Sequence, residues 1–142
     1  METSTLTNEA VLTFVLRVIL GILFFFQGYD KVVNIKINGV ADFYNQELGA
    51  IKLPRFFLVL TAGFTSLAEL ICGVLLVIGL FKTYALYILG IDLILVVGAF
   101  SLIKPMWDMT LLFPRLILLG VLLYLPIEWD IISADFIISK FF

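Results

Sequence analysis

The sequence contains no histidine and only one cysteine, Cys72. A single cysteine cannot form a disulfide within the chain or a C-x-x-C redox pair, and the usual imidazole and thiolate ligands of metal sites are missing. Charged residues make up only 14% of the chain, and no basic patch accompanies the net charge of -2. These absences argue against a metal centre, a dithiol cycle and a nucleic-acid partner. Cys72 lies in an apolar segment, and we interpret it as a buried bystander thiol.

Apolar residues are abundant, at 63% of the chain, with aromatic residues at 15%. The mean hydropathy of +1.17 leaves too little polar surface to coat a soluble domain, which indicates a membrane protein. With 142 residues the chain can supply four membrane spans and their connections but hardly a soluble domain as well. We therefore predict a single membrane domain over residues 1–142 in contact with the lipid bilayer.

The apolar segments predict an all-α fold, an integral membrane four-helix bundle with an interfacial C-terminal helix. The polar leader lacks the positive region of a signal peptide, so the first span should stay uncleaved. The tail 127–142 is too polar to cross the bilayer and too apolar to float free, and we expect it to lie along the interface. The loop 30–55 could be a docking surface or a solvated connection. The predicted spans cover residues 10–29, 56–81, 84–103 and 109–126.

Each predicted span carries one ionisable residue near its apolar core: Arg17, Glu69, Asp92 or Arg115. A charge at the centre of a spanning helix costs roughly 2.5–3.5 kcal/mol on insertion scales, so these side chains should not face lipid. With alternating helix directions and about 1.5 Å of rise per residue, all four fall within a depth band of about 10 Å. We predict an intramembrane charge network, as one four-membered set or as two salt bridges that include an Arg17–Glu69 pair.

Small residues share the helix faces that carry these charges, and small residues let a neighbouring helix approach closely. We interpret these stripes as the bundle interior, with the alternative that Gly and Ala are simply frequent in membrane helices. The stripes comprise Arg17, Gly21, Phe24, Gly28 and Lys31 in the first span, Ala62, Ser66, Glu69, Gly73, Leu76 and Leu80 in the second, and Ala85, Leu89, Asp92, Val96 and Ala99 in the third.

Two segments combine the charges with regularly placed glycines. Leu16–Lys31 holds an Arg, then a Gly, then a Gly shortly before a Lys, and Leu67–Phe81 holds a Glu, a Gly and a terminal Gly-Leu. Together with the four-span layout, these segments resemble the DoxX family from Leu16 to Pro126. The histidines that some members carry near the third and fourth helices are absent. The residues that match the family pattern are Arg17, Gly21, Gly28, Lys31, Glu69, Gly73 and Gly79.

The resemblance implies a small integral protein associated with membrane redox systems, including a subunit of a thiosulfate:quinone oxidoreductase and partners of thiol or oxidative-stress proteins. The sequence offers no cofactor-ligand set and no nucleophile–base pair, so we predict no catalytic residue, metal or resident cofactor. We expect a non-catalytic subunit or scaffold of a larger, redox-linked complex in the bacterial inner membrane, with other membrane subunits as partners. Within an enzyme it would be an accessory subunit of a quinone-linked oxidoreductase. Aromatic residues such as Phe24, Phe25, Phe64 and Phe100 could line a groove for a quinone or a lipid tail.

Two other functions fit the same charges. The chain could be a small transporter or proton-conducting module, in which Glu69 is the carrier group and Arg17 controls its protonation. Alternatively, the charges only specify helix pairing and register. The positive-inside rule favours termini on the outside, because most cationic residues between the spans fall on the face opposite the termini. These residues are Lys31, Lys36, Lys52, Arg55 and Lys104.

Overall fold

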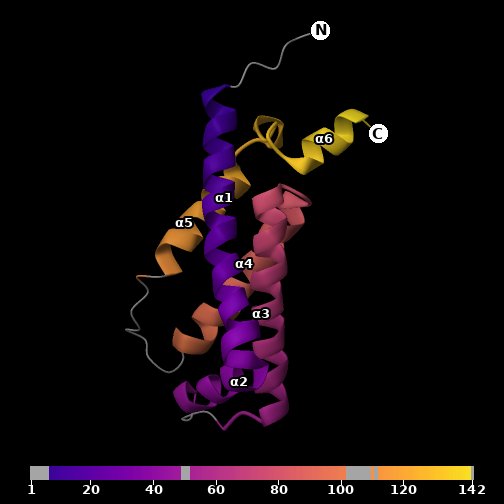
Figure 1. The fold of residues 1–142 in the computed structure, drawn as a ribbon. Coiled ribbons are helices and arrows are strands. Elements are labelled where there is room, and N and C mark those ends of the chain that lie inside the picture. The colour runs from indigo at the N-terminus through magenta and orange to yellow at the C-terminus, as the bar shows by residue number, and fades with distance from the viewer. Residues whose placement is uncertain (1–6, 49–51, 102–109, 111, 142) are drawn as a thin grey trace.

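The computed structural model of the protein describes residues 7–48, 52–101, 110 and 112–141. Every regular element in these ranges is helical, which confirms the all-α prediction for this part of the chain (Figure 1). The elements are α1 (Asn8–Tyr29), the π-helical η1 (Asp30–Ile35), α2 (Lys36–Glu47), α3 (Arg55–Ile78), α4 (Lys82–Ser101), α5 (Leu112–Tyr124), the 3-10 turn η2 (Ile127–Trp129) and α6 (Ala134–Phe141).

Three helical segments in the described ranges are long and apolar enough to cross a membrane: Asn8–Glu47, Arg55–Ile78 and Lys82–Ala99. The first three predicted spans therefore correspond to α1, α3 and α4, with ends that differ by a few residues. The fourth predicted span corresponds to the shorter apolar helix α5, and part of that prediction lies outside the described residues.

Local sequence sets the ends of the two central helices. The hydroxyl of Thr7 caps α1 by accepting a hydrogen bond from the backbone N–H of Ala10 at 3.4 Å. Pro54 precedes the first residue of α3, where its missing N–H costs nothing. At the other end of α3, Gly79 has a φ of +79°, a left-handed conformation that ends the helix and turns the chain into α4.

Glycines bring α1 and α3 into direct backbone contact. A Cβ atom added to Gly73 would lie 2.5 Å from the backbone nitrogen of Phe25, and one added to Gly21 would lie 2.9 Å from the carbonyl oxygen of Gly73. A Cβ atom on Gly28 would collide with the backbone of Leu70. The predicted role of the small residues is thereby confirmed for this pair, and their contacts fix the antiparallel register of the two helices.

The chain bends after α1 and packs α2 against the first turns of α3. Lys36 adopts a φ of 65°, which redirects the backbone between η1 and α2. In α2, Val40, Ala41 and Tyr44 are buried together with Leu58 and Ala62 of α3. Figure 1 shows α2 at one end of the molecule, whereas α6 and the start of α1 lie at the opposite end.

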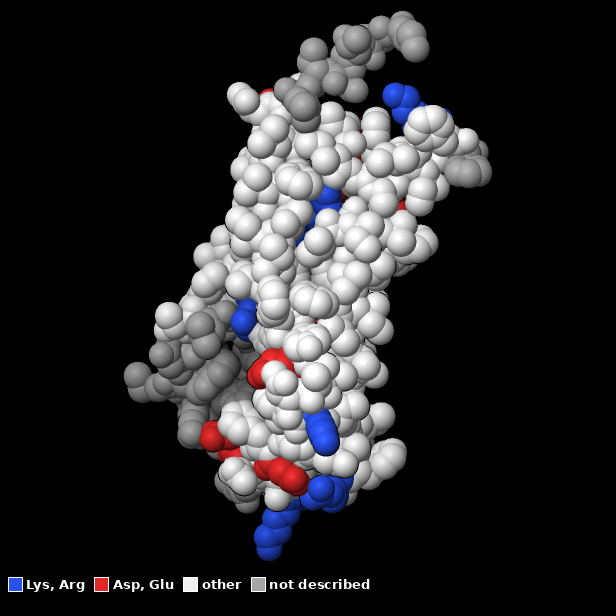
Figure 2. Space-filling view, in the orientation of Figure 1, with Lys and Arg blue, Asp and Glu red and all other residues white. Residues whose placement is uncertain are grey.

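Uncharged side chains cover most of the visible surface, as Figure 2 shows, and charged side chains gather at the end that carries α2. Many large apolar residues on the helices are exposed, for example Ile94 at 72% and Tyr124 at 88%. Such a surface is unfavourable in water and suits contact with lipid chains. In each stripe predicted for the bundle interior, the residue that carries the span's charge, Arg17, Glu69 or Asp92, is buried.

Candidate functional site

Arg17 is completely buried at the turn between α3 and α4, and every nitrogen of its guanidinium group donates a hydrogen bond. Nε donates to Asp130 Oδ1 at 3.3 Å, and Nη2 donates to the carbonyl oxygen of Ile132 at 2.6 Å. Nη1 donates to the carbonyl oxygens of Leu76 and Val77 at the end of α3. These carbonyls lack partners within their own helix, so Arg17 satisfies them in the way a C-terminal cap does.

The C-terminal tail completes this cluster. The ammonium group of Lys82 forms an ion pair with Asp130 Oδ2 at 3.2 Å, although the angle lies outside hydrogen-bond geometry. Asp135 donates a hydrogen bond from its backbone N–H to the carbonyl oxygen of Gly79 at 3.0 Å. Its side-chain Oδ2 accepts a hydrogen bond from the backbone N–H of Lys82 at 3.2 Å. We call Arg17, Lys82, Asp130 and Asp135 the Arg17 cluster. The tail, predicted to lie along the interface, is therefore also anchored to the α3–α4 turn.

The predicted pair between Arg17 and Glu69 is wrong, because the helix register separates the two side chains. Gly28 of α1 lies against Leu70, whereas Arg17 lies beside Gly79. At about 1.5 Å per residue, the end of α3 is some 10–15 Å from Glu69 along the helix axis. The depth estimate failed because it measured each charge from the end of its span, whereas α1 extends beyond the end of α3. The partner of Arg17, Asp130, lies in the tail, where no sequence pattern indicates a buried carboxylate.

Glu69 is instead held by two residues from the C-terminal end of α1 and from η1. Its Oε1 accepts hydrogen bonds from Gln27 Nε2 and from Lys31 Nζ, both at 2.8 Å. The Glu69 side chain is 1% exposed and that of Lys31 is 15% exposed, so the ion pair lies largely out of solvent. Glu69 therefore forms its ion pair with Lys31, one of the residues that match the family pattern.

Asp92 and Arg115 face the same space as Glu69. A cavity of about 730 Å³ lies between α1, η1, α2, α3, α4 and α5. We call it the charged cavity. Arg115 also lies over the ring of Phe24, with its guanidinium carbon 5.7 Å from the ring centroid. The lining residues that carry charge or hydrogen-bonding groups are Gln27, Asp30, Lys31, Tyr44, Glu69, Asp92 and Arg115. Of the four residues predicted to form the charge network, the structure brings Glu69, Asp92 and Arg115 together and places Arg17 elsewhere.

Several buried polar atoms around the charged cavity have no hydrogen-bond partner among the described residues. They are both carboxylate oxygens of Asp92, Oε2 of Glu69, Oε1 of Gln27 and Nε of Arg115. Asp92 is the most notable case, because its side chain is completely buried. A buried polar group without a partner costs about 1–3 kcal/mol, and more when it is charged. These atoms therefore leave hydrogen-bonding capacity unused within the cavity.

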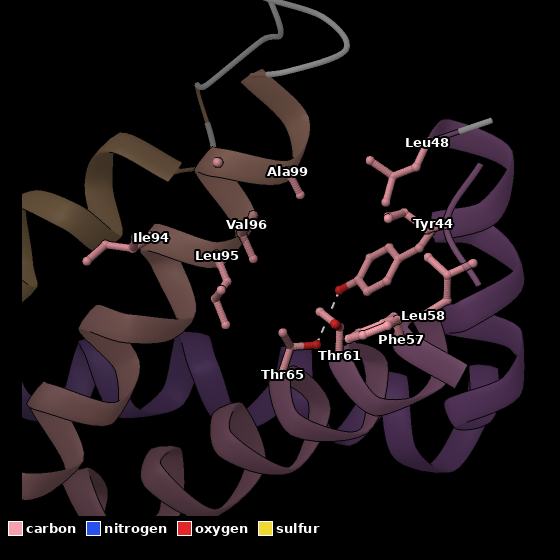
Figure 3. A pocket seen from close by; sticks show the side chains of 12 residues that line it. Tyr44, Leu48, Phe57, Leu58, Thr61, Thr65, Ile94, Leu95, Val96 and Ala99 are labelled. Atoms are coloured by element: carbon pink, nitrogen blue, oxygen red, sulfur yellow. Dashed lines mark hydrogen bonds between the residues drawn. The ribbon is translucent and has the colours of Figure 1, made fainter. Parts of the chain in front are cut away.

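An apolar pocket of about 490 Å³ adjoins the charged cavity, and the two share Tyr44 and Val96 on their walls. Figure 3 shows Tyr44 between the helices, with its hydroxyl group pointing toward Thr65. The two oxygen atoms are 3.2 Å apart. The other lining residues that Figure 3 labels are Leu48, Phe57, Leu58, Thr61, Ile94, Leu95 and Ala99. We call this space the apolar pocket. Of the four aromatic residues proposed to line a groove, Phe24 lines the charged cavity.

No group of three or more His, Cys, Asp or Glu side chains in the described part of the chain is placed to hold a metal ion. Cys72 is buried within α3, in the apolar core. The charged cavity presents carboxylates, an amide and two cationic side chains to a polar or charged group.

Comparison with protein families agrees with the glycine-and-charge pattern that joins α1 to α3. The sequence profile of the DoxX family matches residues 12–104, well over half of the chain. The protein belongs to the DoxX family. This membership confirms the resemblance, and with the three long apolar helices it makes this DoxX protein an integral membrane protein. Neither the curated proteins nor the solved structures contain a match to the chain.

The match covers most of the charged residues that line the charged cavity and half of the Arg17 cluster. Arg17, Lys31, Glu69 and Asp92 lie inside residues 12–104, whereas Arg115 lies outside them. Asp130 and the rest of the tail also lie outside. The four glycines of the family pattern help to place these charges. Close contacts at Gly21, Gly28 and Gly73 set the register of α1 and α3, and Gly79 leaves space for the Arg17 side chain.

Proposed function

We propose that this DoxX protein is a small, non-catalytic subunit of a larger, redox-linked complex in the bacterial inner membrane, and that it contributes a ligand-binding cavity to that complex. The observation that carries the proposal is the set of unpartnered atoms around the charged cavity, above all the buried carboxylate of Asp92. A buried carboxylate without a partner lowers the stability of the fold, so ligand binding explains its presence better than stability does. Family membership supports the association with membrane redox systems.

In this proposal α5 acts as a fourth membrane crossing and completes a four-helix bundle. Its 13 residues would cover about 20 Å, so the crossing needs residues on either side of the helix or a locally thinner bilayer. A fourth crossing would place both termini on one side of the membrane, in keeping with the common end shared by α6 and the start of α1 (Figure 1). Arg115 would then lie within the bilayer, facing the charged cavity rather than lipid.

The role as a subunit can be tested by isolating the tagged protein from its native membranes in mild detergent and identifying what accompanies it by quantitative mass spectrometry. We expect membrane redox proteins in fixed ratio to the tagged chain. The control is Gly28→Leu, which disrupts α1–α3 packing because no side chain fits between Gly28 and Leu70. Specific partners should be lost from this variant while contaminants persist. Recovery of a stable monomer without partners would overturn the proposal.

A second candidate is a transporter or proton-conducting module that uses Glu69. It is supported by the position of Glu69, a buried carboxylate that faces the charged cavity and binds the partly exposed Lys31. In proteoliposomes, proton or substrate flux should then depend on Glu69 and disappear in Glu69→Gln. The matched control is Asp42→Asn, because the Asp42–Arg55 ion pair is exposed and neither residue lines the charged cavity. Equal flux in both variants and in the absence of protein would exclude this candidate.

A further inference from the structure

We infer that the charged cavity binds the ammonium group of a lipophilic primary amine and that the apolar pocket receives its hydrocarbon part. The inference rests on the proposed function insofar as it names a ligand for the same cavity, but it does not depend on the partner complex. It follows from three observations: the unpartnered atoms, the charge of the cavity wall and the adjoining pocket.

The unpartnered atoms specify a hydrogen-bond donor. Four of the five buried atoms without a partner are acceptors, located on Gln27, Glu69 and Asp92. The single unpartnered donor is Nε of Arg115. A primary ammonium group carries three N–H donors and no acceptor, so it matches this set. An anion would instead meet the unpartnered carboxylate oxygens of Glu69 and Asp92, which repel it and cannot donate a hydrogen bond.

The charge of the cavity wall agrees with a cation. The lining contains three carboxylates, on Asp30, Glu69 and Asp92, against two cationic groups, on Lys31 and Arg115. One positive charge on the ligand therefore balances the side chains around it, which matters where the bilayer screens poorly. Aromatic rings also line the cavity and favour a cation over their faces; they belong to Phe24, Phe26, Phe43 and Tyr44.

The adjoining pocket gives the ligand an apolar body. Charged cavity and apolar pocket meet at Tyr44 and Val96, and each has a volume within the roughly 300–1,000 Å³ typical of ligand sites. The rim of the apolar pocket includes Phe57, which is 56% exposed, and Ile94, which is 72% exposed. A hydrocarbon chain can thus leave the site toward the bilayer while the ammonium group stays near Asp92.

Calorimetric titration of the purified protein in phosphatidylcholine nanodiscs tests the ligand class. The probes are n-octylammonium, n-octyltrimethylammonium, 1-octanol and hydroquinone. We expect saturable binding of n-octylammonium. The trimethyl analogue keeps the charge but cannot donate a hydrogen bond, and octanol and hydroquinone can donate but have no charge. Each should bind roughly tenfold more weakly or worse. Equal binding of the charged pair, or tighter binding of a neutral probe, would overturn the inference even if no variant were available.

Two pairs of variants locate the ligand. Asp92→Asn should weaken n-octylammonium by roughly tenfold or more, whereas the control Asp42→Asn should bind as the wild type does. Gly98→Leu fills the apolar pocket without meeting a described atom within 4 Å of the new Cβ, and Gly120→Leu is its control outside the pocket. Gly98→Leu should weaken n-octylammonium but not n-propylammonium. Unchanged binding in Asp92→Asn, or equal losses in the two glycine variants, would contradict the site.

The outcome is independent of the subunit experiment. Amine binding by the isolated protein requires no partner, and capture of redox partners from native membranes requires no amine. If no probe binds, the charged cavity holds water only and the inference fails, while the proposed place in a complex is still decided by co-purification.

Discussion

The Arg17 cluster and the charged cavity contain the same kinds of side chain, but the two central charges of the Arg17 cluster, Arg17 and Asp130, are both paired. Every nitrogen of the Arg17 guanidinium donates a hydrogen bond, and its carboxylate partner Asp130 also binds Lys82. Around the charged cavity, Asp92 has no partner among the described residues and Glu69 uses only one of its oxygens. Buried charges in a membrane protein can therefore be paired within the fold or can keep unused hydrogen-bonding atoms, and the hydrogen bonds of each side chain distinguish the two cases.

The largest loss of stability should follow Arg17→Met. This change removes one partner from a fully buried ion pair, so that Asp130 keeps only Lys82 and two helix-end carbonyls lose their donor. We expect a loss of about 3–5 kcal/mol in the free energy of unfolding. Thermal or denaturant unfolding in detergent measures it. Arg55→Met is the matched control, because the Arg55–Asp42 pair is exposed and worth only about 0–1 kcal/mol. Similar losses in both variants would show that the Arg17 cluster does not hold the fold.

Gly28→Ala should cost about 1–3 kcal/mol or more, because its Cβ would collide with the backbone of α3 at Leu70. This contact sets the register that keeps Arg17 away from Glu69. Gly63→Ala is the control within α3, where the new Cβ would lie 3.9 Å from the side chain of Ile37, an ordinary contact. Its stability should be unchanged or slightly raised. Melting temperatures of the two variants, compared with the wild type, decide the point. A harmless Gly28→Ala would refute the tight contact.

A double-mutant cycle can establish which carboxylate Arg17 meets. Arg17→Gln and Asp130→Asn should show a coupling of about 0.5–3 kcal/mol, because the two side chains are in contact. Arg17→Gln and Glu69→Gln belong to different clusters, and their effects should add within about 0.3–0.5 kcal/mol. The free energies of unfolding of the single and double variants provide both couplings. A larger coupling for Arg17 with Glu69 would restore the pairing predicted from the sequence.

The smallest effect is expected for Asp92→Asn in the absence of ligand. The substitution keeps the shape and removes a buried charge that has no partner, so stability should change by less than about 1 kcal/mol or rise. Glu69→Gln should be tolerated less well, because Lys31 then loses its ion-pair partner. Melting curves of the two variants in the same detergent test this order. A reversed order would indicate that Asp92, rather than Glu69, is the structural charge.

Much of the local structure was predictable, because apolar length and glycine spacing act within one helix at a time. Long apolar runs predicted α1, α3 and α4 to within a few residues. The stripe through Gly21 and Gly28 predicted the face of α1 that meets α3. The convergence of Glu69, Asp92 and Arg115 followed from the cost of exposing charge to lipid, which directs each of them inward.

Pairing was less predictable, because it depends on how far one helix is shifted along another. A shift of two turns moves Arg17 from the level of Glu69 to the end of α3. The burial of Asp130 was not predicted for a related reason. Asp130 is separated from Arg17 by 113 positions and lies in a segment whose composition is typical of a surface tail. No periodicity in the tail signals that its carboxylate becomes buried.

The sequence by itself determined that this DoxX protein is helical, lies in the membrane and directs its charges away from lipid, since each of these follows from the composition and period of single segments. Only the tertiary structure decided which charges meet and which are left without partners, since the glycine contacts between α1 and α3 set the register and the docked tail supplies Asp130. Separating the paired charges from the unpartnered ones therefore required the relative positions of segments far apart in the chain.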